Sequence, residues 1–175
     1  LAYRRGVQAV FQDPLGAGRP RVRGADIVGE ILEIHTSMTA AAIEARVGEV
    51  LELVGLRPDQ ARLFPHEFSG GQRQRIAIAR ALAADARLLV LDEAVSALDV
   101  SIRAQVITLL EQLQADLGVS YLYIGHDLAT VSHLAHRVGV MYLGRLCEVG
   151  DSVTVSTDPR HPYTQALFAS ALPYL

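Results

Sequence analysis

The unbroken apolar run Leu88-Leu89-Val90-Leu91 constrains the fold more than any other feature of the sequence. Four consecutive apolar residues are typical of a strand that is buried on both faces of a parallel sheet. Further short β-rich runs at 7–11, 119–124 and 138–143 alternate with longer segments of helical period. This order predicts the α/β class, with a mostly parallel sheet flanked by helices.

Between the strands, the spacing of apolar residues predicts four helical segments. The first covers 27–34, and the second runs from the N-cap Thr39 to Gly55. A third segment reaches Ala84 without a helix breaker, and a fourth carries an apolar stripe and ends at Gly118. The second is expected to bury one face.

Three further segments have turn or tail character. The residues from 14 to 24 are rich in Gly, Pro and Arg and predict an irregular, exposed loop. Gly144 lies between two short strands and predicts a hairpin, in which the single cysteine, Cys147, is expected to fill space. The stretch 159–175 predicts one short apolar helix.

All 16 basic side chains are arginines, so the 175 residues contain no lysine. This excludes an in-chain Schiff base and the phosphate-binding lysine of a P-loop. A formal net charge of −3 and a pI of about 6.1 give no electrostatic drive toward nucleic acid or an anionic membrane. No apolar run is long enough to span a membrane, and the start lacks the apolar core of a signal peptide, so a cytoplasmic protein is expected.

The strand predicted at 88–91 ends on two adjacent acids, Asp92 and Glu93. Open α/β sheets bind their ligands at the carboxyl ends of their strands, and a carboxylate at that place suits Mg²⁺. The second acid is then available to orient or deprotonate a water molecule. The alternative is that the acidic pair caps the helix after the strand, and the pair by itself does not decide between the two.

A second candidate site is the sequence Ser69-Gly70-Gly71-Gln72, which opens the third helical segment. Glycines let the backbone approach a ligand closely, and the first N–H groups and the dipole of a helix favour phosphate. The alternative is an ordinary capped turn. The residues that flank this sequence favour the phosphate site.

Five motifs in one order resemble the nucleotide-binding subunit of an ABC transporter. Phe68 stands where the family's LSGGQ signature usually has Leu, and Gly125 stands where a Ser usually precedes the switch histidine. In chain order the motifs are the Q-loop in 10–14, the signature in 68–75, the Walker B strand in 87–93, the D-loop in 96–99 and the switch histidine His126.

The resemblance implies a role for each of these residues. Gln12 is implied to ligate Mg²⁺ or its water and to transmit movement from the substrate side, and Asp92 to hold the metal. Glu93 is implied to polarise the attacking water, and His126 to contact the γ-phosphate of ATP. The alternative for His126 is a hydrogen-bonded residue at the start of the next helix. The half-site offered to the nucleotide of a partner subunit is implied to consist of Ser69, Gly70, Gly71, Gln72 and Asp99.

The family's P-loop, G-x-x-x-x-G-K-[ST], lies N-terminal to the Q-loop and is absent from this sequence. The resemblance therefore implies an ABC ATPase domain that is truncated at its N-terminus, with an unpaired flank on its sheet. Residues 1–158 are expected to form this partial domain, with a helical subdomain at about 25–85, and 159–175 a C-terminal tail. By itself the chain is expected not to hydrolyse ATP.

The sequence His161-Pro162-Tyr163-Thr164-Gln165-Ala166-Leu167 resembles the C-terminal motif of oligopeptide, dipeptide and nickel importer ATPases, as does 93–101. This implies the ATP-hydrolysing subunit of a peptide importer at the cytoplasmic face of the membrane. Its implied partners are a second ABC ATPase subunit, permease subunits and, indirectly, an extracytoplasmic solute-binding protein. Arg19, Arg21 and Arg23 either face the permease or form a solvated cluster. Two alternative functions are a soluble ABC ATPase of repair or translation and a non-catalytic interaction fragment.

Overall fold

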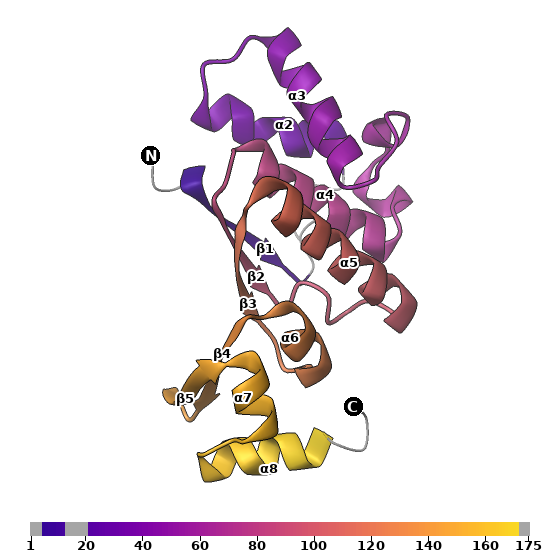
Figure 1. Cartoon of the computed structure of the whole chain (residues 1–175). Helices are drawn as coiled ribbons and strands as arrows, with labels where there is room; N and C mark the ends of the chain where they lie inside the picture. Colours follow the sequence, from indigo (N-terminus) through magenta and orange to yellow (C-terminus); the bar gives the residue numbers. More distant parts are fainter. Residues whose placement is uncertain (1–4, 13–20, 172–175) are drawn as a thin grey trace. The chain divides into compact units, whose positions relative to one another are not determined.

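The computed structural model describes residues 5–12 and 21–171. They fall into two compact units, which divide after Ile124 and are described one at a time. Within these residues the first unit holds a parallel sheet and a layer of helices, and the second an antiparallel hairpin with helices (Figure 1). None of the helices in the described ranges combines the length and the hydropathy that crossing a membrane requires.

The sheet of the first unit confirms the predicted parallel α/β arrangement. Its strands are β1 (Val7–Phe11), β2 (Leu88–Asp92) and β3 (Ser120–Ile124), hydrogen-bonded in that order. All are parallel and end in register, because Phe11 lies opposite Asp92 and Asp92 lies opposite Ile124. The residues that follow β1 and β2 therefore leave the sheet at the same edge (Figure 1).

One set of alternating strand residues is buried beneath two helices, α4 (Gly70–Ala83) and α5 (Val100–Leu117). Leu89 and Leu91 of β2 are fully buried, and the Tyr121 hydroxyl of β3 donates to the Leu110 carbonyl of α5 at 2.8 Å. Burial raises the pKa of Tyr121. The prediction that the apolar run is buried on both faces is wrong for Val90, which is half-buried, because the described helices cover one face of the sheet.

The helical layer confirms the helices predicted before β2. α2 (Gly24–His35), α3 (Ala40–Leu53) and α4 pack on one another, and the short 3₁₀ helices η1 (Gln60–Arg62) and η2 (Pro65–Glu67) lie between α3 and α4 (Figure 1). α3 begins at the predicted cap, where the Thr39 hydroxyl accepts from the N–H of Ala42. The residues of this layer that are completely buried include Val28, Val50, Ile76 and Ile78.

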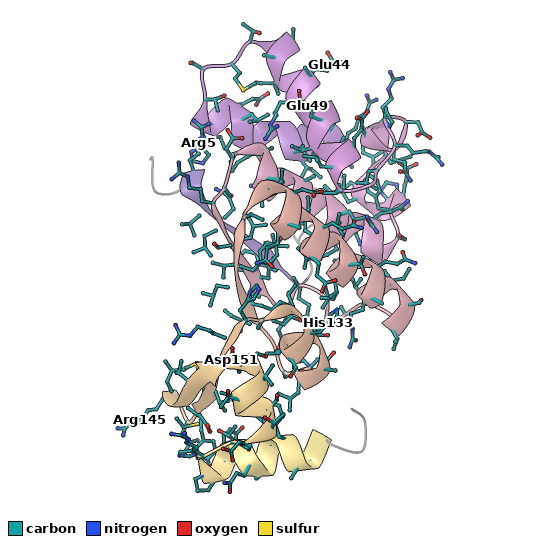
Figure 2. The ribbon with its side chains drawn as sticks, in the orientation of Figure 1. Arg5, Glu44, Glu49, His133, Arg145 and Asp151 are labelled. Atoms are coloured by element: carbon teal, nitrogen blue, oxygen red, sulfur yellow. The ribbon has the colours of Figure 1, made fainter. Side chains whose placement is uncertain are left out.

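Part of the predicted loop at 14–24 falls outside the described residues, which resume at position 21; Arg19 therefore has no place in the structure. Arg21 and Arg23 are exposed, and the Arg23 guanidinium carbon lies 5.9 Å from the centroid of the Phe64 ring. Arg5, labelled in Figure 2, lies just before β1 and donates to the Asp85 carboxylate at 2.8 Å. Because Asp85 follows α4, this ion pair joins the start of β1 to the end of α4.

Phe68 fits against the start of α2. Its side chain is 4% exposed, and a Cβ placed on Gly24 would lie 3.0 Å from the Cζ atom of its ring. Real Cβ atoms essentially never come closer than that distance. The Phe that replaces the family's usual Leu is therefore matched by a residue without a side chain on the neighbouring helix.

The second unit is built on the predicted hairpin, β4 (Arg137–Tyr142) and β5 (Arg145–Asp151), which turns at Leu143 and Gly144 with positive φ angles of 47° and 77°. Val138, Val140, Val155 and Phe168 form its core, and Cys147 packs against them, as predicted. The helices of this unit are α6 (Leu128–Leu134), α7 (Ser152–Thr157) and α8 (Pro162–Ala171).

α7 is the helix that local sequence does not predict, since its residues Val153, Thr154 and Val155 favour strands. Asp151, at the junction of β5 and α7 in Figure 2, caps it by accepting from the N–H groups of Val153 and Thr154 at 3.0 and 3.4 Å. Val155 is buried in the core of the unit. The cap and this burial override the local preference.

Glu148 anchors the start of α8. Its carboxylate accepts from the N–H groups of Arg160 and His161 at 2.9 and 3.0 Å. These two bonds are the main cause that lowers the pKa of Glu148 below its usual range. The Nδ1 atom of His161 in turn accepts from the N–H of Tyr163 at 3.1 Å, so the tail motif is held by hydrogen bonds to its own backbone.

The first prediction concerns Phe68. Gly24→Ala should lower the free energy of unfolding by about 1–3 kcal/mol, because the new methyl group overpacks against the ring. The same glycine change should cost less when Phe68→Leu is also present. Urea denaturation of the wild type, the two single variants and the double variant measures the difference. Losses that simply add would show that the ring and the glycine do not interact.

The second prediction concerns pH. Because the folded pKa of Glu148 is lowered, its contribution to stability is present above the ordinary glutamate pKa of about 4.3 and is lost as the pH falls through the folded value. In thermal melts at neutral pH, the melting temperature of the wild type should exceed that of Glu148→Gln, and the difference should shrink below about pH 4. Glu44→Gln, at an exposed position of α3, is the control and should not change this pH dependence. A constant difference between wild type and Glu148→Gln at all pH values would contradict the assignment.

Candidate functional site

The acidic pair lies at a backbone kink at the end of β2. Glu93 has a φ angle of +48°, a left-handed conformation that is rare for a residue with a side chain. Its N–H donates to the Ile124 carbonyl at 2.9 Å, and its own carbonyl accepts from the N–H and the hydroxyl of Ser96 at 3.1 and 2.8 Å. Such a conformation costs on the order of 1–3 kcal/mol and persists because these bonds hold it on both sides.

The capping alternative for the acidic pair is excluded by the position of the next helix. α5 begins at Val100, and its N-cap residue is Asp99, not Asp92 or Glu93. Both residues of the pair are half-buried at the edge of the sheet. The carboxylates are therefore placed where open α/β sheets bind ligands.

Gln12 leaves the sheet at the same edge. Because Phe11 lies opposite Asp92 in the ladder, Gln12 and Glu93 are the next residues on adjacent parallel strands, whose axes lie about 4.8 Å apart. Gln12 is exposed. The structure thus brings Gln12, Asp92 and Glu93 to one end of β1 and β2. The strand pattern predicts this place for the acidic pair, whereas Gln12 is assigned by resemblance alone.

This set of oxygen ligands suits Mg²⁺ bound together with a phosphate. Mg²⁺ is usually held by one or two carboxylates, with water and phosphate oxygens completing the octahedron. The described residues contain no group of three or more His, Cys, Asp or Glu side chains that could hold a metal ion alone. The residues that would hold the metal are Asp92 and Gln12, and the remaining ligands would come from nucleotide and water.

Ser69 and Gln72 cap α4 reciprocally. The Ser69 hydroxyl oxygen accepts from the N–H of Gln72 at 3.3 Å, and the Gln72 Oε1 atom accepts from the N–H of Ser69 at 2.9 Å. This capping box orders the start of a 14-residue helix. Ser69 is exposed and its hydroxyl proton remains available to a ligand.

The glycines of this motif are required by packing within the unit. A Cβ on Gly70 would lie 3.2 Å from the Cδ2 atom of Leu98, and one on Gly71 only 2.5 Å from the Cγ2 atom of Ile102. The sequence interpretation assigned both glycines to the approach of a ligand. At Gly71, which is buried, the close neighbour is instead the first turn of α5.

Two residues near the D-loop were missed by the sequence reasoning, Ile102 and Arg103. Arg103 Nη2 donates to the carbonyls of Ser96 and Leu98 at 3.4 and 3.2 Å. Asp99, the D-loop residue of the motif, is exposed and its carbonyl accepts from the N–H of Arg103 at 2.8 Å. Neither missed residue stands out by local pattern, because both look like ordinary positions of an amphipathic helix.

His126 belongs to the second unit and is exposed. It follows β3 by two residues and precedes Asp127, the N-cap of α6. The Asp127 carboxylate accepts from the N–H of Ala129 at 3.2 Å and from the hydroxyl of Thr130 at 2.8 Å. The cap of α6 is therefore supplied by Asp127, and His126 is not needed for it.

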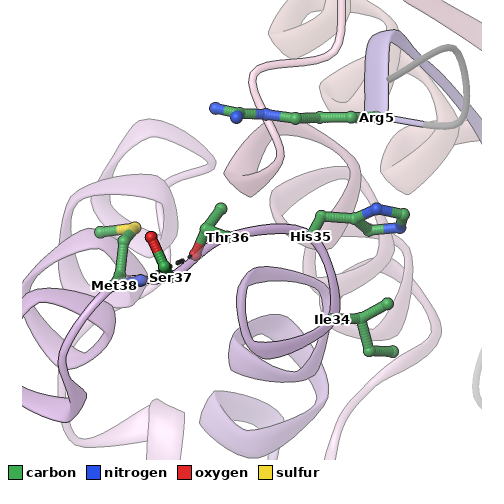
Figure 3. Close-up of a pocket in the computed structure, with 6 residues that line it drawn as sticks. All are labelled: Arg5, Ile34, His35, Thr36, Ser37 and Met38. Carbon is green, nitrogen blue, oxygen red and sulfur yellow. Dashed lines mark hydrogen bonds between the residues drawn. The ribbon is translucent and has the colours of Figure 1, made fainter. Parts of the chain in front are cut away.

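Two open cavities lie away from these motifs. One, of about 540 Å³, is lined by Arg5 and by residues 34–38, where the N–H of Met38 donates to the Thr36 hydroxyl at 3.3 Å (Figure 3). The other, of about 670 Å³, lies between α3 and α5 over Arg75. Neither is lined by the residues of the predicted site.

Comparison with known proteins places these motifs in a family. Residues 2–96, more than half of the chain, match the family model described as ABC transporter. The chain is 52% identical over 169 residues to the glutathione import ATP-binding protein GsiA of Escherichia coli K12. The matched residues make up 97% of this chain and 27% of GsiA. It is 53% identical over 167 residues to a peptide import ATP-binding protein of Brucella abortus strain 2308, covering 95% of this chain and 50% of that protein. The chain thus spans half or less of the length of these relatives.

Solved structures show the same fold. CbiO1 from Clostridium perfringens, part of the ABC transporter complex CbiONQ, superposes with a TM-score of 0.77 over 98% of this chain and 64% of that one. A metal-chelate type ABC transporter in an inward-facing conformation superposes with a TM-score of 0.78 over 86% of this chain and 59% of that one. Both are 24% identical in sequence and bear on the fold.

The third prediction concerns the capping box. Ser69→Ala should lower the free energy of unfolding by about 0.5–2 kcal/mol, because the N–H of Gln72 loses its acceptor. Thr39→Ala, which removes the same kind of cap from α3, is the matched control and should cost a similar amount. An unchanged denaturation midpoint for Ser69→Ala alone would show that the hydroxyl does not cap α4.

Proposed function

This chain belongs to the ABC transporter family, and from that premise we propose that it forms part of an ATP-hydrolysing subunit that energises the import of peptides. The observation that carries the proposal is the common sheet edge of Gln12, Asp92 and Glu93. Support for the substrate class comes from the names of its relatives, which import glutathione and peptides.

We propose that Asp92 and Gln12 hold Mg²⁺ at this edge. A bound Mg²⁺ supplies neutralisation of the charge on the β- and γ-phosphates of ATP. Asp92 is half-buried at the last position of β2, so the ladder to β1 and β3 fixes its backbone. Gln12 follows the strand end and is exposed, which suits a ligand that also responds to movement of its loop.

Glu93 is the proposed general base. The left-handed backbone at this residue departs from the strand direction, so its carboxylate leaves the sheet differently from that of Asp92. Ser96 holds this kink through two hydrogen bonds to one carbonyl. A positioned base of this kind typically contributes about 10²–10⁴-fold to the rate by taking a proton from the attacking water.

The signature and the D-loop are proposed to serve a second subunit. The N-terminus of α4 carries Ser69, Gly70, Gly71 and Gln72. The Ser69 hydroxyl caps the N–H of Gln72, and the N–H groups of Gly70 and Gly71 have no acceptor within the helix. These groups and the helix dipole favour phosphate. Asp99, the D-loop residue, is exposed and is proposed to belong to the same half-site. His126 is proposed to contact the γ-phosphate within its own subunit.

The lysine of a P-loop has to come from outside these 175 residues, because they contain none. The proposed working unit is therefore a larger protein that carries this chain as the 1–158 ATPase part and the 159–175 tail, with the helical subdomain near 25–85. Its proposed partners are a second ABC ATPase subunit, permease subunits and, through these, a solute-binding protein. Its proposed location is the cytoplasmic face of the membrane.

The fourth prediction tests the proposed base. In the complete subunit assembled with its permease, Glu93→Gln should lower the rate of ATP hydrolysis by at least about 10²-fold, because the amide cannot accept the proton of the attacking water. Binding of ATP, followed with a fluorescent analogue, should remain. Glu111→Gln, on α5 and away from the sheet edge, is the control. Hydrolysis that survives Glu93→Gln would remove Glu93 from the mechanism.

A further inference from the structure

The first turn of α5 contacts two motifs at once. Ile102 lies over Gly71 at the start of α4, and the next residue, Arg103, donates to the backbone of the D-loop. Both side chains are half-buried. One helical turn therefore connects the signature to the segment that follows Glu93.

The D-loop segment is ordered by a small number of hydrogen bonds. The N–H of Ser96 donates to the Glu93 carbonyl at 3.1 Å, and the N–H of Leu98 to the Val95 carbonyl at 3.2 Å. The carbonyls of Ser96 and Leu98 both accept from the Nη2 atom of Arg103, at 3.4 and 3.2 Å. Each of these bonds is long, but together they join one charged donor to two carbonyls of the same segment.

Close packing couples this segment to α4. The Leu98 side chain lies against Gly70, and Ile102 lies so close to Gly71 that a methyl group on the glycine would meet it at 2.5 Å. Packed interiors transmit displacement because they have few voids. A shift of the start of α4 therefore displaces Leu98 and Ile102, and with them the D-loop.

We propose that Ile102 and Arg103 form a latch that holds the D-loop and the signature helix together as one body, with Arg103 as a positioning residue for Glu93. The chain of contacts runs from Arg103 to the carbonyl of Ser96, and from the N–H and hydroxyl of Ser96 to the carbonyl of Glu93. The proposal rests on the proposed function in one respect, that Glu93 acts on water. The latch itself orders the backbone of 93–99, whatever the role of Glu93.

The fifth prediction uses the complete subunit with its permease and two readouts. Arg103→Gln should speed hydrogen exchange of the amides of 94–99 by about tenfold, because the carbonyl partners of the guanidinium are released. It should lower kcat for ATP by a similar factor and leave KM unchanged, since no contact to nucleotide is removed. Arg103→Lys, which keeps one charged donor, should change the exchange rate and kcat less than Arg103→Gln does.

The matched control is Arg46→Gln. Arg46 is another half-buried arginine of the same unit, and its guanidinium bonds the Leu82 carbonyl and Asp85 at the far end of α4. Arg46→Gln should lower overall stability but should not change the rate of hydrogen exchange at the amides of 94–99. Equal exchange rates at these amides in Arg103→Gln and Arg46→Gln would overturn the latch.

A second variant keeps the test independent of Arg103. Ile102→Ala should also speed exchange at 94–99 and should slow kcat, because the contact with Gly71 is lost. Unchanged exchange in both Ile102→Ala and Arg103→Gln would overturn the proposal. If exchange rises as expected while Glu93→Gln keeps full hydrolysis, the latch stands and the proposed role of Glu93 fails, so the two failures are distinguishable.

Discussion

The parallel register of β2 between β1 and β3 is the interaction on which the candidate site depends. Leu89 and Leu91 are fully buried beneath the helices, and this burial fixes which face of β2 points inward. Because a strand has a period of two, a slip of one residue would turn Asp92 to the opposite face of the sheet. The hydrophobic burial of two leucines thus determines from which face of the sheet the Asp92 carboxylate projects.

A second constraint is the absence of side chains at the start of α4. Gly71 allows the first turn of α5 to approach within a distance that any other residue would block. Gly70 in the same way makes room for Leu98 of the D-loop. The two glycines therefore serve the packing of α4 against α5 and the D-loop, which explains why the D-loop and the signature lie next to each other in the unit.

The second unit has its own organising group, the carboxylate of Glu148. It binds two backbone N–H groups at the start of α8 and so fixes the residues of the His-Pro-Tyr-Thr motif. Tyr142 of the hairpin packs on Tyr163 of this motif, with ring centroids 4.3 Å apart. The tail motif is thus tied to the hairpin by one ionised group and one aromatic contact.

Local patterns in the sequence determined the strands at 7–11 and 88–92, the strand predicted at 119–124, the helix caps at Thr39 and Gly118, and the acids at the end of β2. Apolar period and turn chemistry are properties of neighbouring residues. The same patterns missed α7, whose β-branched residues favour a strand until Asp151 and the core of the unit hold them as a helix. Only the tertiary structure decided that Glu93 adopts a left-handed backbone, that Gly71 receives Ile102, and that Arg103 binds the D-loop. Those features depend on contacts that the chain's folding creates between separate elements, and no local spacing specifies them.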